Sequence, residues 1–224
     1  MRPDEALAAL SARGDPDDAA AQAAYHKSKR QHLGVRNPVI DELVKDWRAV
    51  LEIEGRVALA DGLWRTDVHE ARIAAAKLLT QARIKDDEAA WRLIASWVPD
   101  FDAWAIADHA ASAGARRLSA YPERLDEVEA WTSDTSFWVR RAALIFTLPW
   151  SKGRHPSPDD RARRERILGW AAGYVHDREW FIQKAIGWWL RSLSKHDPDR
   201  VRAFLEQYGG AMKAFARKEA AKYL

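Results

Sequence analysis

Apolar residues recur along most of the chain at the three- and four-residue spacing of an amphipathic helix. The clearest stretch is 67–83, where one face of a predicted helix carries Val68, Ala71, Ala74, Ala75, Leu78 and Leu79. Alternating runs of β-branched residues with the length of a strand are nearly absent, and good helix formers recur throughout. The pattern therefore predicts an all-α protein.

Proline, glycine and asparagine divide this pattern into short helices. Asn37 is suited to cap a helix that carries Pro38 at its first position. The longest break, 149–158, contains three prolines and is expected to be an exposed connection between two helices, not a domain boundary. A chain of 224 residues can bury a sizeable core, and we expect a single domain over residues 1–224.

A weak internal repeat organises the helices. The segment Phe137–Ala143 (FWVRRAA) recurs 43 positions later as Trp180–Ile186 (WFIQKAI), and fainter copies begin near Ala71 and Ala216. That interval fits a two-helix repeat of the HEAT type. Stacked antiparallel helix pairs of this kind form a curved α-solenoid, whose concave surface suits a long partner such as a DNA duplex.

The composition excludes several classes of protein. The chain has no cysteine, so a disulfide framework or a thiolate zinc site is impossible. The first residues lack the pattern of a secretory signal, and no uncharged apolar run approaches the length of a membrane span. We therefore expect a cytosolic protein without a membrane partner, which for a bacterial chain means the cytosol or nucleoid.

The charge balance permits a polyanionic partner without requiring one. Lys and Arg number 36 against 33 acidic residues, a net charge of +3. The basic residues fall in three clusters, which are Lys27, Lys29, Arg30 and Arg36, then Lys152, Arg154, Arg161, Arg163, Arg164 and Arg166, then Lys213, Arg217, Lys218 and Lys222. If they share a face they form a phosphate-binding track, whereas the interleaved acidic residues also allow ordinary solvated helix faces.

The segment 101–110 contains the strongest candidate for chemistry. Trp104 and Asp108 are four residues apart and therefore lie on one helix face. Alanines at 103, 105, 107, 110 and 111 surround Asp108, and a carboxylate in such a setting is costly without a partner. Asp108 either faces a cationic substrate or pairs with a helix N-terminus or an arginine such as Arg141; the sequence leaves both interpretations open.

Two later helices place an aromatic residue beside a cation. Arg141 follows Trp138 by three residues, and Trp188 follows Lys184 by four. Gly187 interrupts the second of these helices, which indicates close packing, most simply against another helix. A glycine-rich phosphate loop, a nucleophile elbow and metal-ligand spacing of histidines are all absent, so we expect neither a metal nor a cofactor.

From about Tyr25 to Leu224 the chain resembles the AlkD-type DNA alkylation-repair glycosylases. The resemblance rests on Tyr25-His26-Lys27, on Leu33-Gly34-Val35 with Pro38, on 137–146, and most strongly on 180–188. The chain departs from the family at Lys29-Arg30-Gln31-His32, where aromatic and apolar residues are usual, and in the longer connection 149–158.

The resemblance implies an enzyme that removes cationic 3-methyladenine and 7-methylguanine from duplex DNA without deep base flipping. A monomer is the default expectation for the oligomeric state. Trp104 and Trp188 match the family's two site tryptophans, and Asp108 matches its catalytic aspartate. Arg141 matches its DNA-contacting arginine and Tyr25 its N-terminal site tyrosine, while Lys27 and Lys184 are further expected DNA contacts.

Two alternatives compete with this interpretation. The chain could be a non-catalytic HEAT-repeat module that binds DNA or a protein through the same face, although Asp108 and both tryptophans favour an enzyme. It could also be a glycosylase adapted to other lesions, or to branched or crosslinked DNA.

Overall fold

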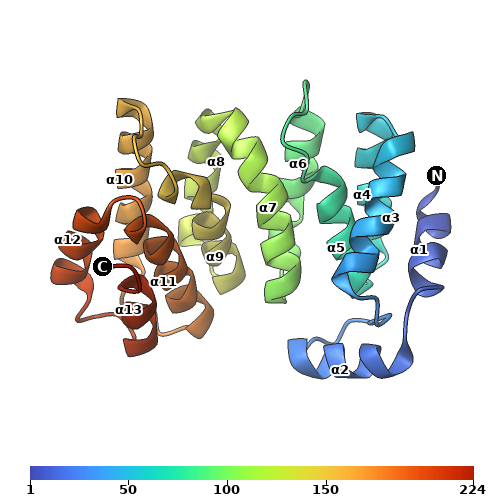
Figure 1. The fold of residues 1–224 in the computed structure, drawn as a ribbon, viewed down its shortest axis with the longest axis horizontal. Helices are drawn as coiled ribbons and strands as arrows, with labels where there is room; N and C mark the ends of the chain where they lie inside the picture. Colours follow the sequence, from blue (N-terminus) through green and yellow to red (C-terminus); the bar gives the residue numbers. More distant parts are fainter. The chain divides into compact units, whose positions relative to one another are not determined.

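The computed structural model describes all residues from 1 to 224 and is built from α-helices (Figure 1). It contains no β-strand, and its one isolated bridge joins Gln31 and Val68. The predicted all-α class is therefore confirmed. The chain divides into two compact units, Met1–Arg117 and Leu118–Leu224, which are described separately below.

Unit 1 contains seven helices, the last of which extends past the unit boundary. They are α1 (Pro3–Ser11), α2 (Pro16–His26), α3 (Asn37–Val50), α4 (Ile53–Arg65), α5 (His69–Leu79), α6 (Glu88–Ser96) and α7 (Trp104–Ala120). A single 3₁₀ turn, Val98–Asp100, precedes α7.

Helix α5 forms the centre of unit 1. Every residue of α5 except Lys77 is buried, and α5 packs against α3 and α4. The predicted helix over 67–83 is thus present but shorter, because Asp67 adopts a left-handed backbone (φ 59°) before it and Thr80 caps its end. The prediction of a single buried face was incomplete, because neighbouring elements enclose this helix on all sides, including its polar residues His69, Glu70 and Arg72.

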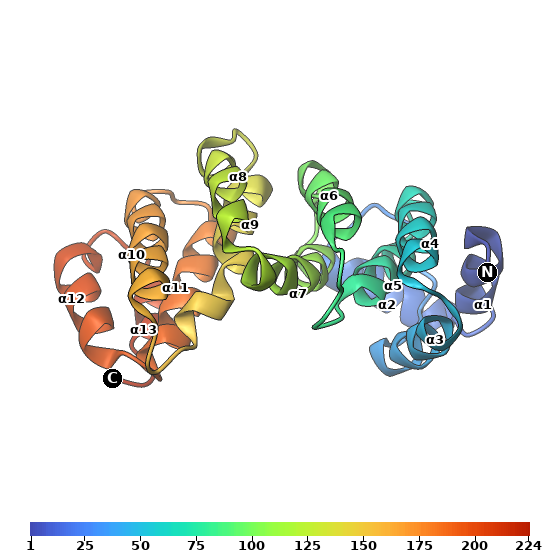
Figure 2. The same cartoon turned by 90° about the horizontal axis from the view of Figure 1, so that it is seen from above.

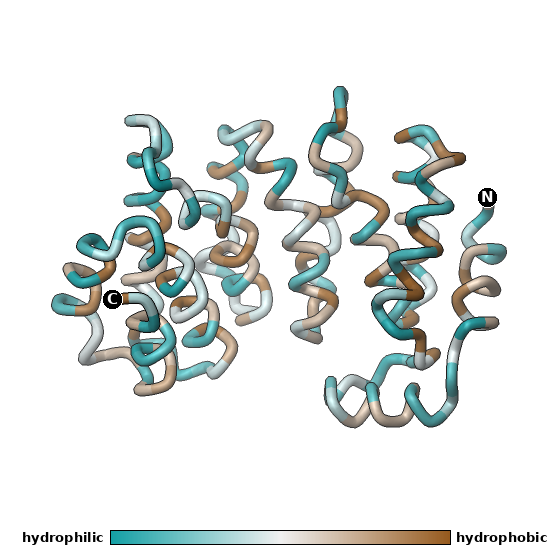
Figure 3. Tube along the Cα trace, viewed as in Figure 1, coloured by the Kyte–Doolittle hydropathy of each residue, from teal (hydrophilic) through white to brown (hydrophobic).

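Helix α2 lies at the opposite extreme, with no buried residue, and Figure 3 shows it mostly in pale and teal colours. Its first turn is capped by Asp15, whose carboxylate accepts hydrogen bonds from the amides of Asp17 and Asp18. Helix α3 begins one residue earlier than predicted. Arg36 occupies its cap position without a side-chain hydrogen bond and Asn37 is already helical, so the prediction that Asn37 caps this helix was wrong.

Unit 2 contains six further helices. They are α8 (Leu125–Ala130), α9 (Phe137–Phe146), α10 (Pro158–Gly173), α11 (Trp180–Ser194), α12 (Pro198–Tyr208) and α13 (Ala214–Ala220). Short 3₁₀ turns occur at Pro122–Arg124, Trp131–Ser133 and Leu148–Ser151. Figure 2 shows these helices from above, with α11 among α10, α12 and α13.

The two copies of the internal repeat occupy equivalent places in unit 2. Phe137 is the first residue of α9 and Trp180 the first residue of α11, and one long helix, α10, lies between them in the chain. Helix α11 packs on α9 and α13. A Cβ atom at Gly187 would lie 3.0 Å from the main-chain oxygen of Ala216 in α13, so close helix packing explains this glycine.

The 149–158 connection is mostly exposed, as predicted, and the unit boundary does not fall in it. Its first residues nevertheless form part of a 3₁₀ turn in which Trp150 and Ser151 are buried. The Ser157 hydroxyl then caps α10 by accepting a hydrogen bond from the amide of Asp160.

Candidate functional site

Trp104 and Asp108 lie on the first two turns of α7, in unit 1. Both side chains are half-buried, whereas the alanines at 103, 105, 107, 110 and 111 are buried. One carboxylate oxygen of Asp108 is shielded from solvent. The helix therefore presents an indole and a carboxylate one turn apart, with small apolar side chains around them.

The structure also brings the N-terminal tyrosine to this place. The Tyr25 ring lies edge-on to Trp104, with 5.9 Å between the ring centroids, and 71% of Tyr25 is exposed. The His26 ring packs against the same indole at 5.1 Å. Lys27 ends α2 in a left-handed conformation (φ 51°) and its side chain is exposed. Tyr25, Trp104 and Asp108 are thus neighbours within unit 1.

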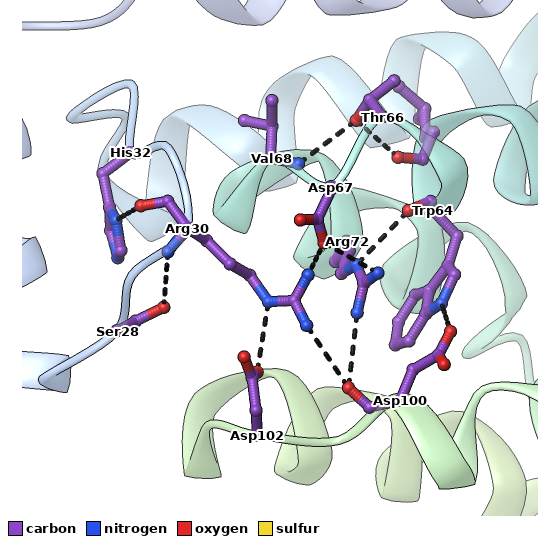
Figure 4. Close-up of polar contacts among 11 residues, drawn as sticks. Ser28, Arg30, His32, Trp64, Thr66, Asp67, Val68, Arg72, Asp100 and Asp102 are labelled. Carbon is purple, nitrogen blue, oxygen red and sulfur yellow. Dashed lines mark hydrogen bonds and ion pairs between the residues drawn. The ribbon is translucent and has the colours of Figure 1, made fainter.

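A network of two arginines fixes the segment that follows Lys27 (Figure 4). Arg30 pairs with Asp67 and donates from Nε to Asp102, at 3.1 Å. Arg72 pairs with the same Asp67 at 2.9 Å, and both guanidinium groups donate to the main-chain oxygen of Asp100. Since Asp100 and Asp102 directly precede α7, this network ties the loop after α2 to the start of the helix that carries Trp104 and Asp108.

Glu70 fixes the other half of the same loop. Its buried carboxylate accepts hydrogen bonds from three successive amides, those of Leu33, Gly34 and Val35, at 2.7–3.3 Å. Gly34 has φ 77°, and a Cβ atom there would lie 2.0 Å from the main-chain oxygen of Asp15. Only glycine fits this position, which explains the Leu33-Gly34-Val35 motif.

Three histidines pack against one another beside Trp104, a cluster that sequence reasoning missed. The ring of His69 lies 4.3 Å from His32 and 4.6 Å from His26. Burial, together with the neighbouring His32, lowers the pKa of His69 to about 3, and it also lowers the pKa of His26. His69 is therefore neutral at neutral pH. The three residues are separated by up to 43 positions, so no local pattern reveals the cluster.

In unit 2, Arg141 is buried on α9. It is 1% exposed, and its guanidinium carbon lies 5.7 Å from the ring centre of Trp138 and 5.9 Å from that of Phe181. The predicted proximity of Trp138 and Arg141 is therefore confirmed. The aromatic rings favour the positive charge by cation–π attraction.

Lys184 and Trp188 lie one turn apart on α11. Lys184 is exposed, and its Nζ lies 4.7 Å from the ring centre of Trp180, which itself stacks on Phe215 at 5.6 Å. Trp188 is half-buried. Gln183 fixes the start of this helix, because its amide donates to the main-chain oxygens of Val175 and Asp177 and accepts from the amide of Lys213.

Several arginines of the predicted basic clusters form ion pairs with acidic side chains. In the first cluster, Arg30 joins the network of Figure 4 and Arg36 pairs with Asp18 at 2.7 Å. In the second, Arg164 is buried and pairs with Asp197, and Arg166 pairs with Asp126 and Glu129. These arginines stabilise the fold through ion pairs. This favours the interpretation of the first two clusters as ordinary parts of helix faces over a phosphate-binding track.

The structure contains no group of three or more His, Asp or Glu side chains arranged to hold a metal ion. None of its helices combines the length and the apolar character needed to cross a membrane.

Comparison with known proteins identifies relatives over almost the whole chain. Residues 6–224 match the family model described as "DNA alkylation repair enzyme". A solved structure titled "Predicted DNA alkylation repair enzyme" from Enterococcus faecalis is 24% identical, with a TM-score of 0.78 over 95% of this chain and 97% of that one. No curated protein matches the chain.

Two structures from Streptococcus mutans are also similar. AlkD2 is 19% identical with a TM-score of 0.61, over 93% of this chain and 98% of that one. The protein smu.31 is 20% identical with a TM-score of 0.60, over 83% and 91%. At these identities the structural matches show a shared helical fold.

Proposed function

Because the chain belongs to the DNA alkylation repair enzyme family, matched over residues 6–224, we propose that it is a DNA glycosylase. It hydrolyses the N-glycosidic bond of cationic alkylated purines, such as 3-methyladenine and 7-methylguanine, in duplex DNA. The observation that carries this proposal is the Trp104–Asp108 pair on one face of α7, with Tyr25 packed on the same indole.

The chemistry needs an anion more than a proton donor. An N3- or N7-alkylated purine carries a positive charge, so it leaves as a neutral base when it takes the electron pair of the C1′–N bond. The sugar is then left as an oxocarbenium-like cation. A water molecule adds to C1′ and releases its proton to Asp108 or to solvent, which completes the hydrolysis.

Electrostatics set the size of this effect. A carboxylate ~4 Å from a unit charge at an effective dielectric constant near ~20 contributes roughly 4 kcal/mol, about a thousandfold in rate if the attraction acts only in the transition state. The alanines on either side of Asp108 in α7 are buried. Asp108 is accordingly assigned the role of stabilising the sugar cation and positioning the attacking water.

Aromatic and basic side chains complete the proposal. Trp104 and Trp188 favour positive charge on the sugar through their ring faces, by about 0.5–2 kcal/mol each as in other cation–π contacts. Tyr25 supports Trp104 from α2. The exposed side chains of Lys27 and Lys184 are assigned to the DNA backbone. Arg141, expected from the family resemblance to contact DNA, is 1% exposed, so it is not assigned a direct phosphate contact. In this proposal the whole chain acts as one DNA-binding domain and as a monomer.

The experiment that tests the proposal compares the wild type with Asp108→Asn. Release of 3-methyladenine and 7-methylguanine from methylated duplex DNA is measured under single-turnover conditions, with binding to unmodified duplex measured alongside. We expect release to fall by about a thousandfold in Asp108→Asn, with binding no weaker than in the wild type. Asp61→Asn, which changes a carboxylate on α4, is the matched control and retains wild-type release.

The outcomes separate the competing functions. Full release by Asp108→Asn would remove the mechanism. Binding of duplex DNA without release by either protein would favour the non-catalytic HEAT-repeat module. A neutral alkylated base should be released poorly, because selectivity here follows from the charge of the lesion and not from a pocket that recognises the base edge.

A further inference from the structure

A basic cavity lies in unit 1, between α3, α4, α5 and α7. Its volume is about 740 Å³, within the range of about 300–1,000 Å³ that is usual for ligand sites. Four basic side chains and one carboxylate line it, together with neutral polar groups: Lys45, Arg48, Arg56, Lys77, Asp41, Thr80, Gln81, His109 and Ser112.

Two of the four basic side chains are held by hydrogen bonds or an ion pair within the chain, and the other two make no ion pair. Arg56 donates to the main-chain oxygens of Leu51 and Arg48, at 2.8 and 2.9 Å, and to the side chain of Gln81. Lys77 pairs with Asp41. Lys45 is exposed and Arg48 is half-buried, and neither makes an ion pair within the chain.

The surroundings of Arg48 are unfavourable to its own charge. Burial and the neighbouring Arg56 guanidinium lower the pKa of Arg48 from its usual value, and no carboxylate opposes them. An anion in the cavity would relieve this repulsion and add charge-assisted hydrogen bonds. The one carboxylate of the cavity, Asp41, pairs with Lys77, so the cavity suits an additional negatively charged group beside Lys45 and Arg48.

Helix α7 connects this cavity to the proposed site. Ser112 lines the cavity one turn after Asp108, and its hydroxyl donates to the main-chain oxygen of Asp108 at 2.9 Å. His109, the residue after Asp108, also lines it. Burial and the positive charge of Lys77 lower the pKa of His109 to about 4, so its imidazole is neutral at neutral pH and offers a hydrogen bond without charge.

We propose that this cavity binds phosphodiester groups of the DNA strand, with Lys45 and Arg48 as direct contacts. The inference rests on the proposed function, since it places the lesion nucleotide at Asp108. His109 and Ser112, which follow Asp108 by one residue and by one helical turn, line the same cavity. A phosphate held here therefore lies beside the part of α7 that carries Asp108.

The test is the salt dependence of binding to unmodified duplex DNA. The logarithm of the binding constant falls with the logarithm of salt concentration with a slope of about −0.9 for each phosphate neutralised. The double variant Lys45→Ala/Arg48→Ala should lower the magnitude of this slope by about 0.9–1.8. Arg65→Ala removes an exposed arginine of α4 that pairs with Asp61, and it should retain the wild-type slope. Thermal melting confirms that each variant is folded.

An unchanged slope in the folded double variant would overturn the inference. Inorganic phosphate is added separately, without DNA, and the imidazole of His109 is followed by NMR. A response to phosphate alone, combined with an unchanged DNA slope, would assign the cavity to a free anion and overturn the assignment to DNA.

Failure of the proposed function gives a different result. If Asp108→Asn keeps full base release while the double variant loses salt dependence, the catalytic mechanism is wrong and the phosphate site stands. If Asp108→Asn loses release while the slope of the double variant is unchanged, the reverse holds.

Discussion

The histidine cluster of unit 1 makes the stability of the protein depend on pH in a defined direction. His69 is 1% exposed and lies against His26 and His32, and the neighbouring Arg30 cation also lowers its pKa. Its pKa is about 3 in the folded protein, against about 6.5 in an unfolded chain. Between these values the unfolded state takes up a proton that folded His69 does not, so stability is lost as the pH falls below about 6.5.

The magnitude follows from the same two values. Each pH unit within that window costs about 1.4 kcal/mol, so the contribution of His69 falls by about 2 kcal/mol between pH 6.5 and pH 5. The replacement His69→Phe keeps an aromatic ring between His26 and His32 but removes the titration. The variant should therefore lose about 2 kcal/mol less than the wild type over this interval.

Urea unfolding at pH 7.5 and pH 5, followed by circular dichroism, measures this difference through the transition midpoint and slope. His155→Phe, which replaces an exposed histidine in the 149–158 connection, controls for the loss of a histidine as such and should behave as the wild type. Carboxylates that titrate in the same interval affect all three proteins equally. The same pH dependence in wild type and His69→Phe would show that His69 accepts its proton within the fold, and would refute the reasoning.

Further predictions concern packing and the loop after α2. Gly187→Ala should lower the free energy of unfolding by about 1–3 kcal/mol, because its Cβ would meet the main chain of α13, whereas Gly169→Ala in α10, with no atom within 4 Å, should raise it by about 0.5–1 kcal/mol; thermal melting of the pair checks both signs. Arg30→Ala should lower the free energy of unfolding by about 1–3 kcal/mol and reduce base release, because the substitution frees the loop that Arg30 ties to Asp102. Arg36→Ala breaks an exposed ion pair and is the control. Equal effects of the two substitutions would contradict this role of Arg30.

The sequence was sufficient for the helices and for features that depend on local spacing. Periodicity predicted the all-α class, the 43-residue repeat corresponds to the equivalent starts of α9 and α11, and four-residue spacing placed Trp104 and Asp108 on one face. Each of these follows from the geometry of a single helix. The burial of α5 on all sides could not be predicted from the sequence pattern, because alanine is compatible with both a surface and a core.

Features that depend on contacts between distant segments were not predictable. The basic cavity draws on α3, α4, α5 and α7, so its cations never form a run in the sequence, whereas the runs that do occur contain arginines committed to ion pairs. The same holds for the histidine cluster. Charge density along a sequence measures how many cations are near one another in the chain, but not how many acidic partners the fold brings to them.

The enclosure of α5 has a consequence for how unit 1 opens and how it tolerates substitution. The helix carries alanines at 71, 74, 75 and 76 that are 0% exposed, so any larger side chain there must displace neighbouring helices. Its amide protons can reach solvent only when the surrounding helices separate, so they should exchange at the rate of the slowest opening of the unit. During divergence, α5 should accumulate the fewest changes in side-chain volume, while α2, with no buried residue, is free to drift.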